Sequence, residues 1–165
     1  MILATSITQS ILLVVGILLV VSLLLILLLL FVKEKLAPSG PVKIKINGEK
    51  IRFSGIDTPE LKQTCIISGV ENFCGLKAKE ILMEKISDQK VVCVSEGKDQ
   101  YKRTLAECFV NDESLSSYLV RSGYAFAYRK YSKKFVSDEE FAKSNKLGIW
   151  SMEFDYPWDW RKKTN

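Results

Sequence analysis

The sequence predicts a small α+β domain preceded by one transmembrane helix. Residues 1–32 contain no Lys, Arg, Asp or Glu, and the stretch Ile11–Val32 is apolar apart from Gly16 and Ser22. After this stretch, strand-like alternation appears first, and helical spacing of apolar residues dominates later. Strands followed by helices in a chain of this length are typical of a single α+β domain.

The apolar stretch is long enough to cross a bilayer. Its roughly 22 residues would form a helix of about 33 Å, against a hydrocarbon core of about 30 Å. A cleaved signal peptide would have a positive n-region, a shorter apolar segment and a small-residue cleavage site. This segment has an uncharged n-region and ends in Phe31-Val32-Lys33. We therefore expect residues 1–32 to be an uncleaved membrane anchor, followed by a polar linker over residues 33–41.

The domain begins with a β-hairpin. Ile44 and Ile46 alternate with lysines, and Asn47-Gly48 is the residue pair preferred in two-residue hairpin turns. Further strands are expected over residues 91–95 and 104–110. Helices are expected over 75–86, 112–122 and 137–148. Five short strands with three helices suit a β-barrel of the OB type.

The composition limits the partners and the catalytic mechanisms that this chain could use. The formal net charge is +5, which favours an anionic partner such as nucleic acid or lipid head groups. The chain has no histidine. Ser-His-Asp hydrolysis, histidine-based metal nuclease motifs and phosphohistidine chemistry are therefore excluded. Catalysis would depend on carboxylates, Arg, Lys, Tyr or a metal bound through oxygen.

The four cysteines are expected to form two disulfides, Cys65–Cys74 and Cys93–Cys108. If the strands around 93 and 108 form a hairpin turning near residues 100–101, the two positions lie opposite each other, within reach of a bridge. A four-cysteine zinc site is an alternative, but the usual short Cys-x₂₋₄-Cys spacing is absent. Four free core thiols are the other alternative.

The cysteines also bear on membrane orientation. Two disulfides would require an oxidising compartment, so we expect the domain on the extracytoplasmic (periplasmic) side. Lys33 and Lys35 directly follow the apolar stretch and favour the opposite, cytoplasmic orientation by the positive-inside rule. The cytoplasmic face is therefore the alternative.

Three charged residues that could form a site lie in and just after the second strand of the first hairpin, and a fourth lies later in the chain. Arg52 precedes Asp57 and Glu60, which flank Thr58-Pro59, and Arg103 lies in a later loop. The two carboxylates could converge on one hard cation such as Ca²⁺. Two arginines, two carboxylates and no histidine suit phosphodiester hydrolysis, in which Glu activates water and the guanidinium forks stabilise the developing charge. A surface ion pair between Arg52 and Asp57 is the alternative.

Four segments resemble the staphylococcal (thermo)nuclease family. They are IRFSGIDTPE, DQYKRTLA, SSYLVRSGYA and EEFAKSNKLGIWS, in this order and spacing. The resemblance covers residues 42–151, and residues 152–165 are left as an aromatic and basic tail. It implies a five-stranded OB-type barrel with three helices.

The resemblance also implies residue roles. Arg52 and Arg103 would stabilise the transition state, and Glu60 would be the general base. Asp57 and the carbonyl of Thr58 would be calcium ligands. In one respect the chain departs from the family pattern: an alignment through the Asn47-Gly48 turn places Val42 where a second metal-binding Asp is expected. Loss of this carboxylate would weaken the site.

These observations lead to two functional hypotheses. The first is a membrane-anchored, Ca²⁺-dependent, monomeric nuclease (a phosphodiesterase or endonuclease) acting on DNA or RNA. The second is a catalytically impaired nuclease-like domain that binds nucleic acid or a protein partner. The arginines and Glu60 favour the first hypothesis, and Val42 favours the second. In the tail, the aromatic residues between 154 and 160 could stack bases or fold onto the barrel.

Overall fold

The computed structural model describes residues 15–26, 44–46 and 49–164. The chain divides into two units, residues 1–38 and residues 39–165, which are treated separately. Val42, at the position where the family pattern has a metal-binding Asp, lies outside the described residues, and so do the hairpin residues 47–48.

In the first unit, residues 15–26 form a helix with exposed side chains. Within the part of the chain that the structure describes, no helix is both long and apolar enough to cross a membrane. Only the middle of the expected span Ile11–Val32 belongs to that part, because residues 11–14 and 27–32 lie outside it.

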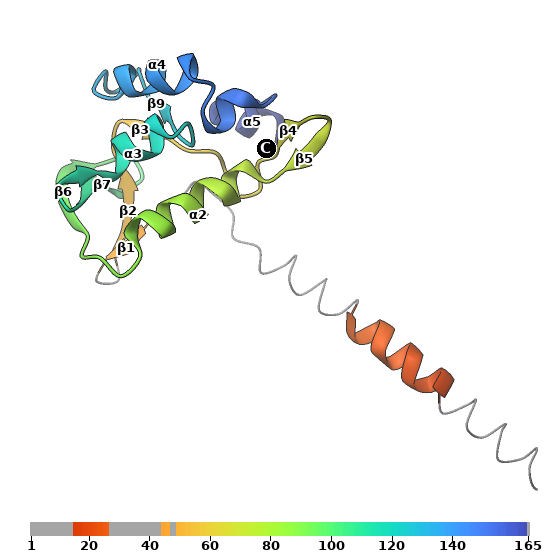
Figure 1. Ribbon diagram of the computed structural model, residues 1–165. Coiled ribbons are helices and arrows are strands. Elements are labelled where there is room, and N and C mark those ends of the chain that lie inside the picture. Colours follow the sequence, from red (N-terminus) through yellow and green to blue (C-terminus); the bar gives the residue numbers. More distant parts are fainter. Residues whose placement is uncertain (1–14, 27–43, 47–48, 165) are drawn as a thin grey trace, which may run out of the picture. The chain divides into compact units, whose positions relative to one another are not determined.

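The second unit contains short strands and several helices (Figure 1). The strands are β1 (Ile44–Ile46), β2 (Glu49–Phe53), β3 (Ile56–Asp57), β4 (Cys65–Ile67), β5 (Val70–Asn72), β6 (Val92–Lys98), β7 (Thr104–Val110), β8 (Glu113–Ser114) and β9 (Phe126–Ala127). The helices are α2 (Cys74–Ile86), α3 (Leu115–Arg121), α4 (Val136–Ser144), the short 3₁₀ helix η1 (Gly148–Ser151) and α5 (Pro157–Thr164).

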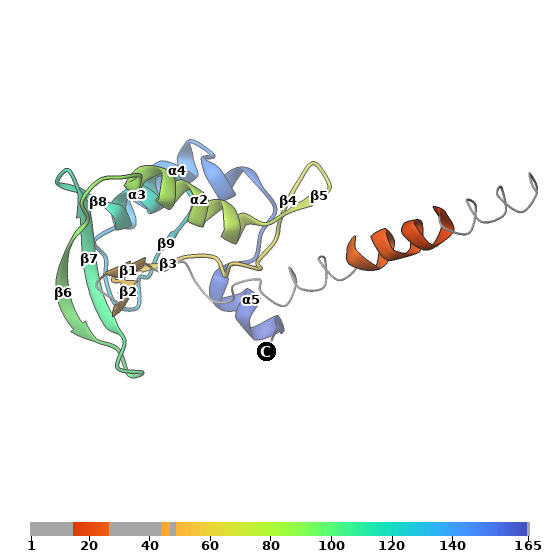
Figure 2. The ribbon, with the colours of Figure 1, turned by 90° about the horizontal axis from the view of Figure 1, so that it is seen from below.

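The main sheet has the strand order β1-β2-β7-β6, with β8 paired to β7. β1 and β2 form the expected antiparallel hairpin, and the pairing of Ile46 with Glu49 leaves two residues for the connection. Two further pairs, β3–β9 and β4–β5, lie off this path. Figures 1 and 2 show the main sheet at one end of the domain and the β4–β5 hairpin at the other. This is an OB-like α+β fold.

A parallel pair links two distant parts of the sequence. β2 runs parallel to β7, with Arg52 opposite Leu105. Arg103 directly precedes β7, so this pairing brings the two arginine-bearing segments to neighbouring strands. Parallel strands need a long crossover, and here it contains α2.

The main core lies between the sheet and the helices α2 and α3. Apolar side chains at helical spacing, such as Ala78 and Leu82 of α2 and Leu115 and Leu119 of α3, are at most 2% exposed. They pack with Phe53 and the inward-facing residues of β7. The expected helix over 75–86 corresponds to α2, and the expected helix over 112–122 is shortened because residues 113–114 pair with β7.

A second, aromatic core holds the C-terminal tail. Phe126 is fully buried, and its ring centroid lies 5.1 Å from Tyr156 and 5.4 Å from both Trp150 and Phe154. Tyr156 in turn stacks on Trp158 at 4.6 Å. The tail therefore folds onto the domain.

The tail also adds a helix. The sequence predicted three helices in the domain, but α5 is a further helix, formed by Pro157–Thr164. Proline at a first helical position and lysines in a last turn both favour helix formation. The helical pattern was missed because the segment is short and aromatic rather than amphipathic.

Both expected cysteine pairs are bonded in the structure. Cys65 and Cys74 join β4 to the start of α2, with their Cα atoms 5.7 Å apart. Cys93 and Cys108 face each other across β6 and β7, with their Cα atoms 4.0 Å apart. The described residues contain no free cysteine.

Replacing Cys93 and Cys108 together by Ala should lower the free energy of unfolding by about 3 kcal/mol, because the bridge closes a loop with a sequence separation of 15. Urea unfolding of the full chain measures the change. The Cys65→Ala/Cys74→Ala variant provides the comparison: its loop, with a separation of 9, is shorter, so the entropic loss should be smaller. Unchanged stability of both variants would contradict the prediction.

Candidate active site

The site lies where β3 ends. Asp57 is the last residue of β3 and pairs with Phe126 of β9, and Thr58 and Pro59 lead into a turn in which the N–H of Gln63 donates to the carbonyl of Glu60 at 2.7 Å. Asp57 is 2% exposed, Thr58 4% and Glu60 7%. Buried carboxylates are unfavourable unless hydrogen-bonded or paired with positive charge. This position therefore demands a nearby cation.

Arg161 of α5 provides that cation. Its Nη2 lies 2.5 Å from Oδ2 of Asp57, and its Nη1 lies 2.9 Å from Oε1 of Glu60 and 3.4 Å from Oδ1 of Asp57. One guanidinium therefore binds both carboxylates. Burial opposes its charge, but the bonds to Asp57 and Glu60 outweigh this effect, and the pKa of Arg161 lies above its usual value.

Arg161 was not among the residues singled out from the sequence. It follows Trp160 and precedes two lysines, so it looks like part of a solvated basic end. Its partners lie about 100 residues earlier in the chain. No local spacing rule links positions so far apart.

Arg52 approaches the carboxylate of Asp57 from β2. Its Nη2 lies 3.9 Å from Oδ1 of Asp57, and its side chain is 22% exposed. The structure thus brings Arg52, Asp57 and Glu60 together, as expected, and adds Arg161. Two negative and two positive side chains meet in this cluster.

Arg103 is held elsewhere. Its Nε donates to Oδ2 of Asp99 at 2.6 Å, and the backbone amides of Arg103 and Tyr101 donate to Oδ1 of Asp99 at 2.9 Å. Desolvation opposes ionisation of Asp99, but these bonds outweigh it, and the pKa of Asp99 lies below its usual value. Among the described residues, Arg103 is not one of the cations paired with Asp57 or Glu60.

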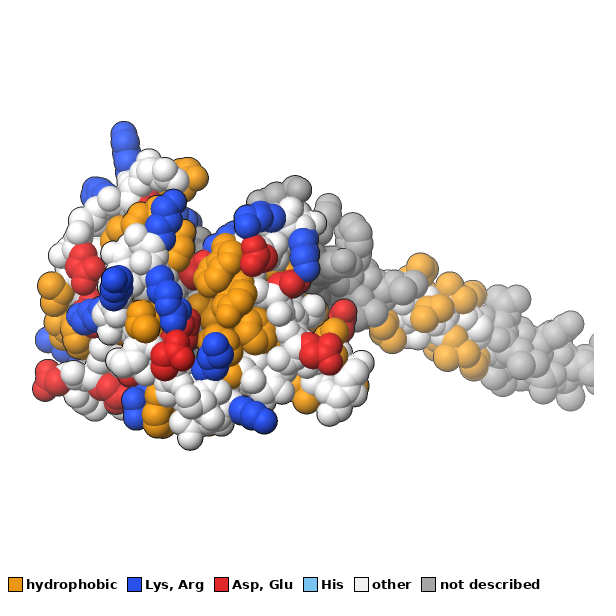
Figure 3. Space-filling model, turned by 90° about the horizontal axis from the view of Figure 1, so that it is seen from above, with side chains coloured by type: hydrophobic (Ala, Val, Ile, Leu, Met, Phe, Trp, Pro, Cys, Tyr) orange, Lys and Arg blue, Asp and Glu red, His pale blue; other side chains and the backbone are white. Residues whose placement is uncertain are grey.

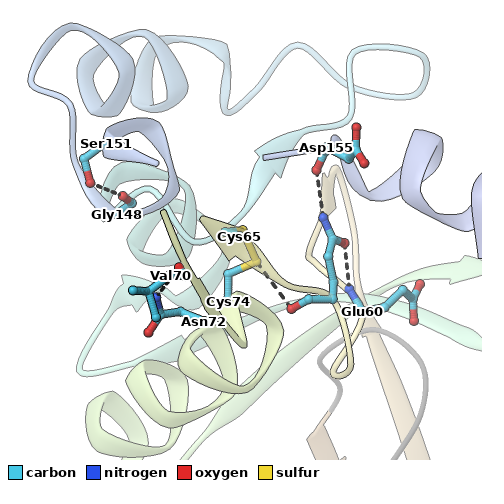
Figure 4. The surroundings of a disulfide bond; sticks show 9 residues. Glu60, Cys65, Val70, Asn72, Cys74, Gly148, Ser151 and Asp155 are labelled. Atoms are coloured by element: carbon cyan, nitrogen blue, oxygen red, sulfur yellow. Dashed lines mark hydrogen bonds between the residues drawn. A yellow bond between two sulfur atoms is a disulfide. The ribbon is translucent and has the colours of Figure 1, made fainter. Parts of the chain in front are cut away.

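Gln63 fixes the backbone of the turn (Figure 4). Its Oε1 accepts from the N–H of Glu60 at 3.2 Å, and its Nε2 donates to the carbonyl of Asp155 at 2.7 Å. Figure 4 draws these two hydrogen bonds as dashed lines that end at Glu60 and Asp155. The turn and the C-terminal tail are therefore connected at one point.

Gly75 allows α2 to approach this turn closely. A Cβ at Gly75 would lie 1.8 Å from the carbonyl oxygen of Glu60. The Gly75 N–H also donates to the carbonyl of Gln63 at 3.3 Å. Only glycine fits at this contact, and the start of α2 thereby supports the backbone of Glu60.

The donor set suits a hard cation only in part. Asp57 and Glu60 already turn three carboxylate oxygens toward one positive group, the Arg161 guanidinium, which stands in for a cation. In the described part of the chain, however, no group of three or more His, Cys, Asp or Glu could hold a metal. Two carboxylates and the Thr58 carbonyl would need water to complete a calcium shell of six to eight oxygens.

The surface charge is mixed. Figure 3 shows Lys and Arg interspersed with Asp and Glu around a stretch of hydrophobic side chains on the face it draws. That face does not carry a continuous basic surface. Binding of a polyanion there would depend on local cations rather than on a broad positive field.

Comparison with known proteins identifies the family. The family model described as staphylococcal nuclease homologue matches residues 50–152, which include most of β2, the segment from Asp57 to Glu60, β7 and the helices α2, α3 and α4. The chain belongs to the staphylococcal nuclease family. α5 and Arg161 lie beyond the matched residues.

Curated relatives agree with this membership. The chain is 29% identical over 117 residues to an uncharacterized endonuclease of Haemophilus influenzae, a match that covers 69% of this chain and 61% of that protein. It is 32% identical over 114 residues to the succinoglycan biosynthesis protein ExoI of Rhizobium meliloti (67% and 60%). It is 27% identical over 116 residues to the staphylococcal-like nuclease CAN1 of Arabidopsis thaliana (68% and 33%). The matches thus span less than two thirds of each of these relatives.

Gly75→Ala should lower the free energy of unfolding by about 1–3 kcal/mol, because the added methyl group must push α2 away from the Glu60 backbone. The urea midpoint of the full chain measures this loss. Glu84→Ala is the matched control, since Glu84 is exposed on the same helix, and it should stay within about 0.5 kcal/mol of wild type. Equal stability of the two variants would contradict the close contact.

Proposed function

We propose that this protein is a nuclease that hydrolyses phosphodiester bonds of DNA or RNA. The observation that supports the proposal best is the meeting of Arg52, Asp57 and Glu60 at the end of β3, in a chain of the staphylococcal nuclease family. Relatives named as nucleases or endonucleases add support.

In the proposed mechanism, Glu60 is the general base and takes a proton from the attacking water. The water oxygen bonds to phosphorus while the P–O bond to the leaving group breaks, and the leaving oxygen takes a proton from solvent. The Arg52 fork binds a non-bridging phosphate oxygen and stabilises the charge that develops on it. We propose the same role for Arg103 in the loop before β7; its guanidinium is bonded to Asp99 and would have to turn away from it to reach the phosphate. Histidine is absent from the chain, so a carboxylate is the fitting base.

Calcium dependence is part of the proposal. Asp57 and the Thr58 carbonyl would hold the ion, which would supply positive charge beside the phosphate. The carboxylate expected at position 42 is replaced by Val42. With fewer charged ligands, the affinity for calcium should be lower than in a site with two carboxylate ligands.

The alternative function is binding without efficient cleavage, to nucleic acid or to a protein partner. The contact of Arg161 with both carboxylates favours it, because a base that accepts from a guanidinium cannot readily accept a proton from water. A cleavage assay distinguishes the two functions, because only the nuclease would hydrolyse nucleic acid efficiently.

Glu60→Gln and Arg103→Ala should each lower kcat by about 10²-fold or more, in the range expected for loss of a base or of an electrostatic stabiliser. Plasmid DNA and RNA cleavage by the full chain, with added calcium, measures the rate. Glu84→Gln is the control for Glu60, since it removes an exposed carboxylate distant in sequence from the turn. Full activity of both Glu60→Gln and Arg103→Ala would place the chemistry elsewhere.

We further propose that residues 1–32 anchor the chain in a membrane, with the domain on the extracytoplasmic (periplasmic) side and the protein monomeric. The uncharged apolar stretch supports the anchor, and the two disulfides support an oxidising compartment.

This location predicts that all four cysteines resist alkylation when cells expressing the full chain are quenched without reductant. The chain should also remain in membranes after an alkaline carbonate wash. A reduced, denatured aliquot is the control and should show every cysteine labelled. Alkylation of all cysteines in the unreduced sample would instead indicate the cytoplasmic face.

A further inference from the structure

Arg161 takes up the acceptor oxygens that a metal ion would need. It uses both oxygens of Asp57 and Oε1 of Glu60 at 2.5–3.4 Å. Calcium held by Asp57 would have to approach the same Asp57 oxygens to about 2.3–2.6 Å. A guanidinium and a metal ion cannot both occupy that position.

Local charge leads to the same conclusion. The carboxylates of Asp57 and Glu60 are balanced by the guanidinium groups of Arg161 and Arg52. A divalent cation entering this neutral cluster would face two positive groups at close range. Binding becomes favourable only when one of them leaves.

Arg161 is the group that can leave. Arg52 lies within β2 and is held by the sheet. Arg161 lies in the last helix, whose other charged side chains make local contacts: Lys162 with Asp159, and Lys163 with Asp155. Among the described residues, Arg161 is thus the side chain of α5 that forms ion pairs with the turn.

The segment before α5 is firmly attached, which returns Arg161 to the same place. Glu153 and Ile66 exchange two backbone hydrogen bonds, at 2.8 and 3.0 Å. Gln63 holds the carbonyl of Asp155, and Tyr156 and Trp158 contact Phe126. A short displacement of residues 159–164 would leave these contacts in place and would free the carboxylates.

We infer that α5 is a built-in inhibitory plug: Arg161 occupies the cation position of the Asp57–Glu60 pair and must leave before a divalent cation binds. The same contact keeps Glu60 from acting as a base. Metal binding and release of α5 are therefore linked, each favouring the other. The inference rests on the proposed function for the role of the metal.

Calorimetry with calcium chloride, on the full chain in detergent and without nucleic acid, tests the competition. Arg161→Gln should bind calcium at least about fivefold more tightly than wild type, within the usual range of coupling between sites. Lys162→Gln removes the same charge from the same helix without contacting the turn, and its affinity should match that of wild type. Calcium binding to Arg161→Gln no tighter than to wild type, or no binding to any variant, would overturn the inference.

Tryptophan fluorescence provides a second readout, since Trp160 lies within the segment of α5 that would be displaced, residues 159–164. Calcium should shift the emission of wild type and Lys162→Gln as residues 159–164 are displaced, and should change that of Arg161→Gln much less. If Arg161→Gln does not fold, Arg161→Lys keeps the charge but loses the bidentate fork, and its calcium affinity should exceed that of wild type. An affinity of Arg161→Lys equal to wild type would then overturn the inference.

The calcium-binding test of the plug and the cleavage test of the nuclease can fail independently of each other. Tighter calcium binding by Arg161→Gln with no cleavage by any variant would retain the plug and reject the nuclease. Calcium-dependent cleavage by wild type with unchanged affinity in Arg161→Gln would do the reverse.

Discussion

Two buried carboxylates, Asp57 and Glu60, impose the main constraint on this domain. A carboxylate with a few per cent of its surface exposed needs positive charge or hydrogen-bond donors close by. The chain meets this need twice, with Arg52 from a central strand and with Arg161 from the last helix. β2 and α5 thus each place one arginine beside the carboxylates that follow β3.

The surroundings of the turn give it a defined backbone. Gln63 joins the Glu60 amide to the tail, Gly75 lets α2 reach the Glu60 carbonyl, and the Cys65–Cys74 bridge ties α2 to β4. Preorganisation of this kind is what electrostatic catalysis requires, because the charged groups need not rearrange during the reaction. The tail is part of that support through Asp155, and it also carries the group that blocks the carboxylates.

The C-terminal tail extends the chain beyond the region that the family model matches. The match ends at residue 152, and the aromatic residues after it cover Phe126 and lead into α5. A nuclease fold with its own C-terminal cation would remain inactive until metal or substrate competes successfully for the carboxylates. Such restraint would limit cleavage to conditions in which a divalent cation is available.

Local sequence patterns by themselves determined several elements of this fold. The Asn47-Gly48 pair and the flanking alternation predicted the β1–β2 hairpin, and helical spacing predicted α2. The equal distances of Cys93 and Cys108 from the turn predicted that they face each other. The charged motif around Thr58-Pro59 predicted that Asp57 and Glu60 converge, and the family resemblance gave roles to Arg52, Asp57 and Glu60. These features depend on contacts within a short stretch of chain or on a recognisable motif.

Only the tertiary structure decided the partner of the carboxylates. Arg161 and Asp57 are 104 positions apart, and nothing in the sequence around Arg161 distinguishes it from a solvated basic end. Their contact arises because aromatic packing on Phe126 carries the tail back across the domain, and because a buried negative pair attracts the guanidinium within reach. Long-range packing and charge neutralisation are cooperative properties of the whole fold, and no local pattern encodes them.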